Sequence, residues 1–186
     1  MSAPIDIRRE CRPSDLDAIL ALHASVYPAE YGVNSEFVAQ VADRVADAGA
    51  AGFPRERDAA WIVELDGEFA GSIVLTDEGD DTGCVRWVLF DPRVRGRGLG
   101  RRLMGELIEH ARSLGYRRLR LETFSELRAA AAIYRDAGFE VVAEETGPRW
   151  GREITYQHYE LDLQSSNTRR ASSRPSTNRS ISSGVV

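Results

Sequence analysis

Residues 85–114 constrain what this chain can fold into more than any other segment. They run from an apolar strand through an arginine- and glycine-rich turn into an amphipathic helix, and such a helix start presents unpaired backbone N–H groups to an anion. Gly96, Gly98 and Gly100 carry no Cβ, so a ligand can approach the backbone closely. The same turn carries positive charge suited to a pyrophosphate, from Arg95, Arg97, Arg101 and Arg102. The segment therefore predicts a phosphate-binding turn between a strand and a helix.

A Rossmann dinucleotide site is the main alternative for this turn. It has the same order of strand, glycine turn and helix, and Glu122 near the end of the next strand matches its acidic residue. The spacing argues against it, because the turn reads GxGxG and lacks the third position of GxGxxG. A Walker A turn is excluded because no Gly-Lys-Ser/Thr is present. A helix start without a ligand is disfavoured, since the arginines would repel one another in the absence of an anion.

Hydrophobic periodicity and turn signals predict a mixed sheet. Helices are expected to begin at Ser14, as N-cap with Asp17 three residues on, and at Ser35. Asp66-Gly67 predicts a hairpin. Strands are expected at residues 5–11, 60–65, 69–76, 84–90, 118–124, 139–144 and 154–163, and further helices at 99–114 and 126–137. We expect an α/β (α+β) fold: a mixed, mostly antiparallel central sheet of about six to seven strands with helices on both faces, and parallel pairing in the second half.

Length and charge indicate the domain organisation. The chain has 186 residues, enough for one domain with a substantial core, which we expect to cover residues 1–163. Residues 164–186 are rich in Ser and Arg and poor in apolar side chains, which predicts a disordered tail. The net charge is −5, and the tail contributes only positive charge, so the body is more acidic than the whole. An acidic body argues against nucleic acid as a partner.

Other features of the sequence bear on the cellular location of the protein and on whether it binds a metal. The sequence has no run of about 18 apolar residues, so we expect no membrane association through a spanning helix. Charges within the first eleven residues argue against a signal peptide and favour the cytoplasm. Cys11 and Cys84 are isolated and are expected to be reduced. Three scattered histidines predict no metal site, and His23 and His110 are expected to be core-edge residues.

Two motifs in this sequence resemble those of the GNAT N-acetyltransferases. Residues 95–100, Arg-Gly-Arg-Gly-Leu-Gly, look like the family's Q/R-x-x-G-x-G/A acetyl-CoA motif, and residues 88–92 stand where the family has the end of a strand. Residues 130–139 resemble its A-x-x-x-Y-x-x-x-G-F signature. The element order agrees with the family over the whole expected domain. Arg86 and the closing residues 157–163 look most like a bacterial subgroup also found fused to winged-helix regulators, although no such DNA-binding module is present here.

The resemblance implies an N-acetyltransferase domain that uses acetyl-CoA. Backbone groups of one strand would pair with the pantetheine arm, the glycine turn would wrap the pyrophosphate, and the phenol of Tyr134 would protonate the departing thiolate. The implied cofactor-binding residues are Val88, Leu89, Phe90, Arg95, Gly96, Arg97, Gly98, Leu99, Gly100 and Arg101. One departure from the family is Leu127, which replaces an Asn that often contacts pantetheine.

The sequence constrains the identities of the general base and of the acceptor substrate less than it constrains the identity of the cofactor. Glu122 interrupts an apolar strand near its C-terminal end and is the leading candidate base, unless it pairs with Arg86 or Arg120. Arg86 could instead bind a substrate carboxylate, which would indicate an amino-acid-like acceptor. His158 lies in the strand that borders the acceptor cleft in the family. Tyr31 could join Tyr27, Trp150 and Tyr156 in an aromatic wall around an amine, or these rings could be ordinary packing.

With this resemblance, we expect transfer of an acetyl group from acetyl-CoA to a primary amine of a small molecule, by direct attack in a ternary complex, with no metal. The alternative from another class is a non-catalytic acyl-CoA-binding sensor or interaction module. We expect a monomer or a homodimer.

Overall fold

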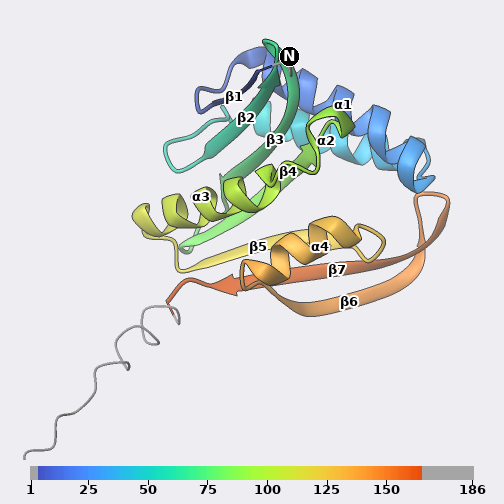
Figure 1. The fold of residues 1–186 in the computed structure, drawn as a ribbon. Helices are drawn as coiled ribbons and strands as arrows, with labels where there is room; N and C mark the ends of the chain where they lie inside the picture. Colours follow the sequence, from blue (N-terminus) through green and yellow to red (C-terminus); the bar gives the residue numbers. More distant parts are fainter. Residues whose placement is uncertain (1–3, 165–186) are drawn as a thin grey trace, which may run out of the picture.

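The chain folds around one seven-stranded sheet with the strand order β1-β2-β3-β4-β5-β7-β6 (Figure 1). This computed structural model describes residues 4–164. The strands are β1 (Ile5–Arg8), β2 (Ala59–Leu65), β3 (Glu68–Asp77), β4 (Thr82–Phe90), β5 (Arg118–Phe124), β6 (Glu140–Arg149) and β7 (Arg152–Asp162). The helices are α1 (Pro13–Tyr31), α2 (Ser35–Ala50), α3 (Leu99–Ser113) and α4 (Arg128–Asp136), with a short 3-10 turn at Pro92–Val94. The predicted fold class is confirmed.

The first four strands form an antiparallel meander. The predicted hairpin between β2 and β3 is present, and its two turn residues, Asp66 and Gly67, have φ values of 56° and 81°. Positive φ at both central residues is the geometry that Asp-Gly favours, because its twist matches that of the flanking strands. This meander fixes the position of β4, which carries the strand end of the glycine turn.

Only one neighbouring pair of strands in the sheet is parallel. β4 and β5 pair in parallel, with α3 as the crossover between them, as expected for the second half of the chain. The expectation of parallel pairing does not extend to β6, which lies at the sheet edge because β7 is inserted between β5 and β6 and pairs antiparallel with both. The tight hairpin at Trp150-Gly151 returns β7 alongside β6, which places β7 next to β5.

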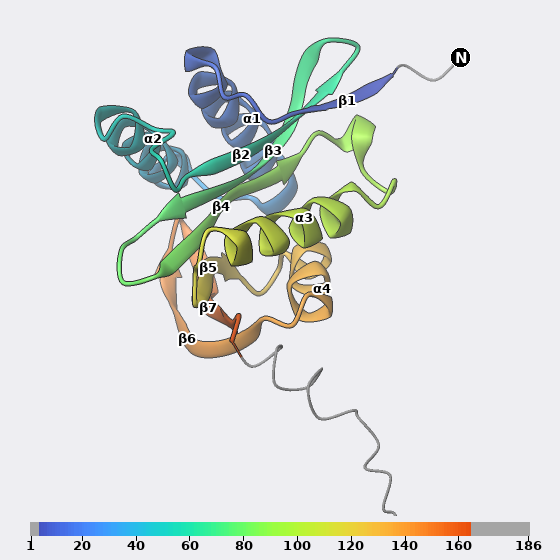
Figure 2. The ribbon, with the colours of Figure 1, turned by 90° about the vertical axis from the view of Figure 1, so that its left-hand side faces the viewer.

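The helices cover the two faces of the sheet in pairs, α1 with α2 on one face and α3 with α4 on the other (Figure 2). Each pair buries its own apolar cluster. The cluster under α3 and α4 includes Trp61, Leu107 and Tyr159. The cluster under α1 and α2 includes Ile62, Phe124 and Trp150. Burial of this size on both faces accounts for most of the stabilisation of such a sheet.

Two helix starts differ from the prediction. Helix α1 begins at Pro13 with Arg12 as N-cap, two residues earlier than a Ser14 cap would give. The reason is Asp15, whose buried carboxylate accepts from the Arg12 backbone N–H and pairs with Arg8 at 2.8 Å. Helix α4 begins at Arg128 instead of residue 126, because a turn closed by the Leu127 N–H on the Phe124 carbonyl precedes it.

Part of the expected domain organisation lies beyond the described residues. The predicted tail comprises residues 164–186, and all of it except Gln164 lies outside the described residues. Within residues 4–164, none of the helices combines the length and the apolar character needed to cross a membrane.

Candidate functional site

Strands β4 and β5 pair only at their N-terminal ends. The parallel register runs from Thr82 opposite Arg118 to Cys84 opposite Arg120 and stops there. Beyond Cys84, β4 keeps its pairing with β3 as far as Phe90, while β5 keeps its pairing with β7 as far as Phe124. The facing edges of residues 85–90 and 121–124 therefore have no strand between them in the described chain. We call this space the β4–β5 gap, and its open β4 edge is where an extended ligand can add as a strand.

A β-bulge lies on β4 inside this gap. Ser72 pairs with Leu89 and Val74 with Arg86, so two β4 residues, Trp87 and Val88, oppose Ile73 alone. Trp87 has φ 48°, and its carbonyl accepts a hydrogen bond from the Ser72 hydroxyl at 2.7 Å. A bulge bends its strand and turns the following backbone, and bulges are frequent beside functional sites. Here it includes Val88, the first residue of the Val88–Leu89–Phe90 edge that the family resemblance assigns to the cofactor.

The glycine turn leads from β4 into α3 with exposed backbone amides. Gly98 is the N-cap of α3 at φ 75°, and no heavy atom lies within 4 Å of the position a Cβ would take there. The first hydrogen bond of the helix runs from the Arg102 N–H to the Gly98 carbonyl at 3.1 Å, so the N–H groups of the three preceding residues have no partner in the helix. These unpaired amides and the helix dipole are the features that favour an anion at a helix start.

Gly100 serves packing rather than ligand approach. A Cβ on Gly100 would lie 2.6 Å from Cδ1 of Ile133, so the first turn of α3 sits directly against α4. The sequence analysis assigned the same role, close approach of a ligand, to all three glycines of the turn. The structure separates them, because Gly98 faces open space and Gly100 faces a neighbouring helix.

The arginines of the turn do not repel one another as expected, because carboxylates from other elements pair with them. Arg95 pairs with Glu30 of α1 at 2.8 Å, Arg101 with Asp136 of α4 at 2.6 Å, and Arg102 with Glu106 at 2.9 Å. Exposed pairs of this kind stabilise by only about 0–1 kcal/mol, so a phosphate can compete for the same guanidinium groups.

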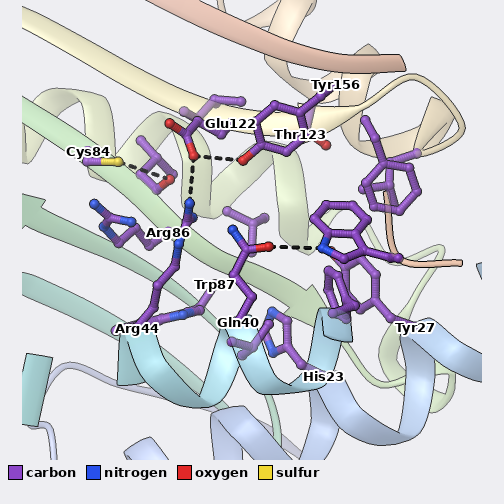
Figure 3. A pocket seen from close by; sticks show the side chains of 18 of the residues that line it. His23, Tyr27, Gln40, Arg44, Cys84, Arg86, Trp87, Glu122, Thr123 and Tyr156 are labelled. Atoms are coloured by element: carbon purple, nitrogen blue, oxygen red, sulfur yellow. Dashed lines mark hydrogen bonds and ion pairs between the residues drawn. The ribbon is translucent and has the colours of Figure 1, made fainter. Parts of the chain in front are cut away.

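A pocket of about 110 Å³ occupies the β4–β5 gap (Figure 3). Residues 84–88 of β4 and 121–124 of β5 form its walls. Helices α1 and α2 contribute His23, Tyr27, Phe37, Gln40, Val41 and Arg44, and the remaining lining residues are Leu127, Tyr134, Trp150 and Tyr156. The structure thus brings Tyr134, Glu122, Arg86 and Val88 of the predicted site residues to one pocket.

The two candidate acid–base groups approach this pocket from opposite faces of the sheet. Tyr134 belongs to the apolar cluster beneath α3 and α4. Glu122 points to the other face, where it meets Arg44 of α2 and Tyr156 of β7 (Figure 3). The glycine turn is on the Tyr134 face, since it begins α3. The gap between the strands is the passage that connects the two groups.

Glu122 is held as an ionised carboxylate. Its Oε2 accepts from the Tyr156 hydroxyl at 2.7 Å and from Arg44 at 2.9 Å, and its Oε1 lies 3.7 Å from Nδ1 of His158. Burial by itself would raise the pKa of Glu122, but the hydrogen bonds from Tyr156 and Arg44 and the charge of Arg44 outweigh it and lower the pKa below its usual value. Glu122 is therefore negatively charged at neutral pH.

Tyr134 is a buried phenol with a free hydroxyl at the pocket. Its ring packs against Phe139 and Tyr159, with centroids 6.2 and 5.8 Å away. No hydrogen bond joins its hydroxyl to another residue within 4–164. Burial raises the pKa of Tyr134 well above the ordinary value, so the hydroxyl keeps its proton at neutral pH and can donate it.

The remaining predicted residues lie around the pocket in different ways. Arg86 lines it, but its guanidinium donates to Glu78 at 2.7 Å and to Thr76 at 3.1 Å. Glu122 thus pairs with neither Arg86 nor Arg120, because both of these bind Glu78. Of the other predicted side chains, Leu89 and Tyr31 pack in the α1–α2 cluster, Phe90 is partly buried against the opposite cluster, and His158 lies beside Glu122; none of the four lines the pocket.

The sequence reasoning missed Gln40, Arg44 and His23 as polar side chains of the pocket. Gln40 and Arg44 stand three and seven residues after Phe37, on the same face of α2 as its apolar stripe, and Gln40 accepts from the Trp150 indole at 2.9 Å. Polar side chains in line with an apolar stripe are the signal that could have found them. His23 was expected to be a core-edge residue and instead lines the pocket.

Comparison with known proteins identifies the family. The sequence model of the acetyltransferase (GNAT) family matches residues 16–139. The chain belongs to the acetyltransferase (GNAT) family. It is 35% identical over 115 residues to the uncharacterized N-acetyltransferase YjgM of Escherichia coli, covering 60% of this chain and 69% of that protein. It is 30% identical over 115 residues to N-acetylaspartate synthetase of Danio rerio, covering 55% of this chain and 41% of that protein. The predicted enzyme class, an N-acetyltransferase, is confirmed by these relatives.

Solved GNAT structures share the fold. The Salmonella typhimurium putative acetyltransferase yncA, solved with its cofactor acetyl-CoA, superposes with a TM-score of 0.68 at 22% identity, covering 87% of this chain and 95% of that one. A putative phosphinothricin N-acetyltransferase superposes with a TM-score of 0.69 at 21% identity, covering 86% and 99%. At sequence identities of 21% and 22%, the structural similarity shows that the fold is shared. Within residues 4–164, no group of three or more His, Cys, Asp or Glu side chains is placed to hold a metal ion.

Proposed function

We propose that this protein transfers the acetyl group of acetyl-CoA to a primary amine of a small molecule, by direct attack in a ternary complex. The observation that carries the proposal is the β4–β5 gap, which joins the face with the glycine turn and Tyr134 to the face with Glu122 and Arg44. Donor and acceptor can enter from opposite faces and meet between the strands.

The donor side fits acetyl-CoA. The free β4 edge after the bulge suits the two amides of the pantetheine arm, and the unpaired N–H groups after Gly98 suit the pyrophosphate. Arg95, Arg97 and Arg101 stand around the same turn. The GNAT neighbour that holds acetyl-CoA supports this choice of donor. Leu127 lines the pocket, and its side chain can contact a ligand through apolar atoms only.

The transfer needs few chemical groups from the protein. The neutral amine attacks the thioester carbonyl carbon, the new C–N bond forms, the C–S bond breaks, and the thiolate takes the proton of Tyr134. Holding amine and thioester in line can supply about 7–11 kcal/mol of the barrier. Tyr134 then regains a proton from the acetylated ammonium group through solvent.

Glu122 attracts the amine more than it deprotonates it. A carboxylate whose pKa lies below its usual value is a weak base, but it is a good partner for the ammonium form of the incoming amine. An amine with a pKa of about 10.4 is neutral only about once in a thousand molecules at pH 7. The amine's own ionisation should therefore control how the rate depends on pH.

The pH dependence of the rate tests this role of Glu122. With 2-phenylethylamine as acceptor and saturating acetyl-CoA, kcat/KM should rise about tenfold per pH unit between about pH 7 and pH 9, because the neutral fraction of the amine does so. Initial rates across this range measure the slope. A plateau beginning near neutral pH would instead identify a protein base with a pKa near 7.

The arginines of the pocket favour an acceptor that also carries a carboxylate. Arg44 and Arg86 both line the pocket, and guanidinium groups bind carboxylates bidentately. The name of the Danio rerio relative, N-acetylaspartate synthetase, is consistent with an amino-acid acceptor. We assign the carboxylate contact to Arg86, because its partner Glu78 is also bound by Arg120 and keeps that partner when Arg86 turns to a substrate, whereas Arg44 holds Glu122 in place.

A matched pair of acceptors tests this contact. L-phenylalanine and 2-phenylethylamine differ only in the carboxylate, and wild-type kcat/KM should favour L-phenylalanine by about tenfold, the effect of one charged hydrogen bond. Arg86→Gln should remove this preference. Arg120→Gln is the control, because Arg120 shares Glu78 with Arg86 but does not line the pocket. If both variants keep the preference, Arg86 does not bind the carboxylate.

CoA release from acetyl-CoA in the presence of L-phenylalanine, 2-phenylethylamine or hydroxylamine tests the proposed function itself. Catalysis predicts amine-dependent release. Tight binding of acetyl-CoA with no release for any amine would favour the alternative, a non-catalytic acyl-CoA sensor. Likeness to the subgroup fused to winged-helix regulators, a cytoplasmic location, and a monomer or homodimer remain predictions.

A further inference from the structure

His23 projects from α1 into the pocket with one ring nitrogen unused (Figure 3). The residue is 5% exposed. Its Nδ1 is 2.8 Å from the Ile19 carbonyl oxygen one turn earlier in the helix. Within the described chain, no residue hydrogen-bonds the other nitrogen, Nε2.

The contact with Ile19 determines which nitrogen carries the proton. A carbonyl oxygen can only accept a hydrogen bond, so Nδ1 must be the donor. Burial lowers the pKa of His23 to about 4, so the ring is neutral at pH 7 and Nε2 carries a lone pair. Nε2 is not closed off inside the protein but reaches the pocket, so it is available to accept a hydrogen bond from a bound ligand.

The ring is also held in one orientation. Tyr27 stacks on it with centroids 5.4 Å apart and planes 6° from parallel, and Phe37 of α2 stacks on Tyr27 at 4.5 Å. With Nδ1 fixed by the helix and the ring fixed by the stack, the direction of Nε2 is set before any ligand arrives. Fixed acceptors of this kind bind without the entropy cost of ordering a side chain.

His23 lies on the acceptor side of the gap. It belongs to α1, which together with α2 covers the sheet face to which Glu122 points, opposite the glycine turn. We propose that Nε2 of His23 accepts a hydrogen bond from an N–H of the acceptor amine and so aims the nitrogen lone pair at the thioester carbon. This inference rests on the proposed function. In it, Glu122 attracts the charged amine and His23 orients the neutral one.

Two substitutions separate this role from a structural one. His23→Asn keeps a donor near the position of Nδ1, and hence the bond to Ile19, but removes Nε2. His23→Gln places an amide oxygen near the position of Nε2 and loses the bond to Ile19. A structural histidine would tolerate Asn better than Gln, whereas an amine-binding histidine would tolerate Gln better than Asn.

The probe is hydroxylamine, a small amine whose access does not depend on the rest of the acceptor. At saturating acetyl-CoA, His23→Asn should lower kcat/KM for hydroxylamine about fivefold, the effect of one neutral hydrogen bond, and His23→Gln by less than about twofold. The KM for acetyl-CoA should stay unchanged in both, because the donor binds on the other face. Thermal unfolding should show His23→Gln as the less stable variant.

The outcomes separate the two proposals. If wild-type enzyme releases CoA and the Asn variant matches it, or loses acetyl-CoA affinity in parallel, His23 does not bind the amine while the proposed function stands. If the wild type releases no CoA with hydroxylamine, L-phenylalanine or 2-phenylethylamine, the proposed function fails and the role of His23 with it.

Discussion

Tyr134→Phe should lower kcat by about a hundredfold or more, since a positioned general acid typically contributes about 10²–10⁴-fold. The thiolate would then leave without a proton, because the neighbouring phenol, Tyr159, does not line the pocket and donates to Gln157 at 3.3 Å. The KM for acetyl-CoA should change little, because the phenol is not needed for the β4 edge or the glycine turn. Steady-state CoA release with hydroxylamine measures both constants.

Tyr159→Phe is the matched control for that variant. Tyr159 is buried in the same aromatic cluster, 5.8 Å from the Tyr134 ring, and loses the same hydroxyl, but it does not line the pocket. Its kcat should remain within about threefold of wild type, less than the effect of one neutral hydrogen bond to the substrate, because the Tyr159 hydroxyl does not reach the pocket. Equal losses in both variants would mean that the Tyr134 hydroxyl acts through packing, and no loss in either would remove it from the mechanism.

Local chemistry explains what could be predicted from the sequence. The Asp66-Gly67 hairpin, the glycine turn and the start of α2 at Ser35 each depend on residues within a few positions of one another. Turn conformation and helix capping are set at that range. The mostly antiparallel sheet followed from the meander, which is itself a series of short local connections.

Contacts between distant residues explain what could not be predicted. Glu122 and its partner Arg44 are 78 positions apart, and the insertion of β7 between β5 and β6 decides which groups lie beside Glu122. Nothing near Glu122 in the sequence distinguishes Arg44 from Arg86 or Arg120 as its partner. His23 looked like a core residue because helical periodicity gives the face of a side chain but not whether a pocket lies beneath it.

Gly98→Asp should weaken binding of CoA by about thirty- to a hundredfold. Gly98 caps α3, and the new carboxylate would stand next to the amides that we assign to the pyrophosphate. Two like charges about 6 Å apart repel by about 2–3 kcal/mol at an effective dielectric constant of about 20. Calorimetric titration with CoA measures the loss. Because salt screens this repulsion, the loss should be smaller at high ionic strength.

Gly98→Asn separates charge from shape in this test. Asn is nearly the same size as Asp and tolerates the positive φ of this position, and the space around it is open, so the backbone should keep its conformation. Gly100 offers no such comparison, since a Cβ there would first displace Ile133. If the Asn variant binds CoA as weakly as the Asp variant does, the turn requires glycine so that the ligand can approach the backbone closely. If neither variant weakens the binding of CoA, the pyrophosphate binds elsewhere. A negative charge placed beside the amides must lower the affinity for CoA if these amides hold the pyrophosphate.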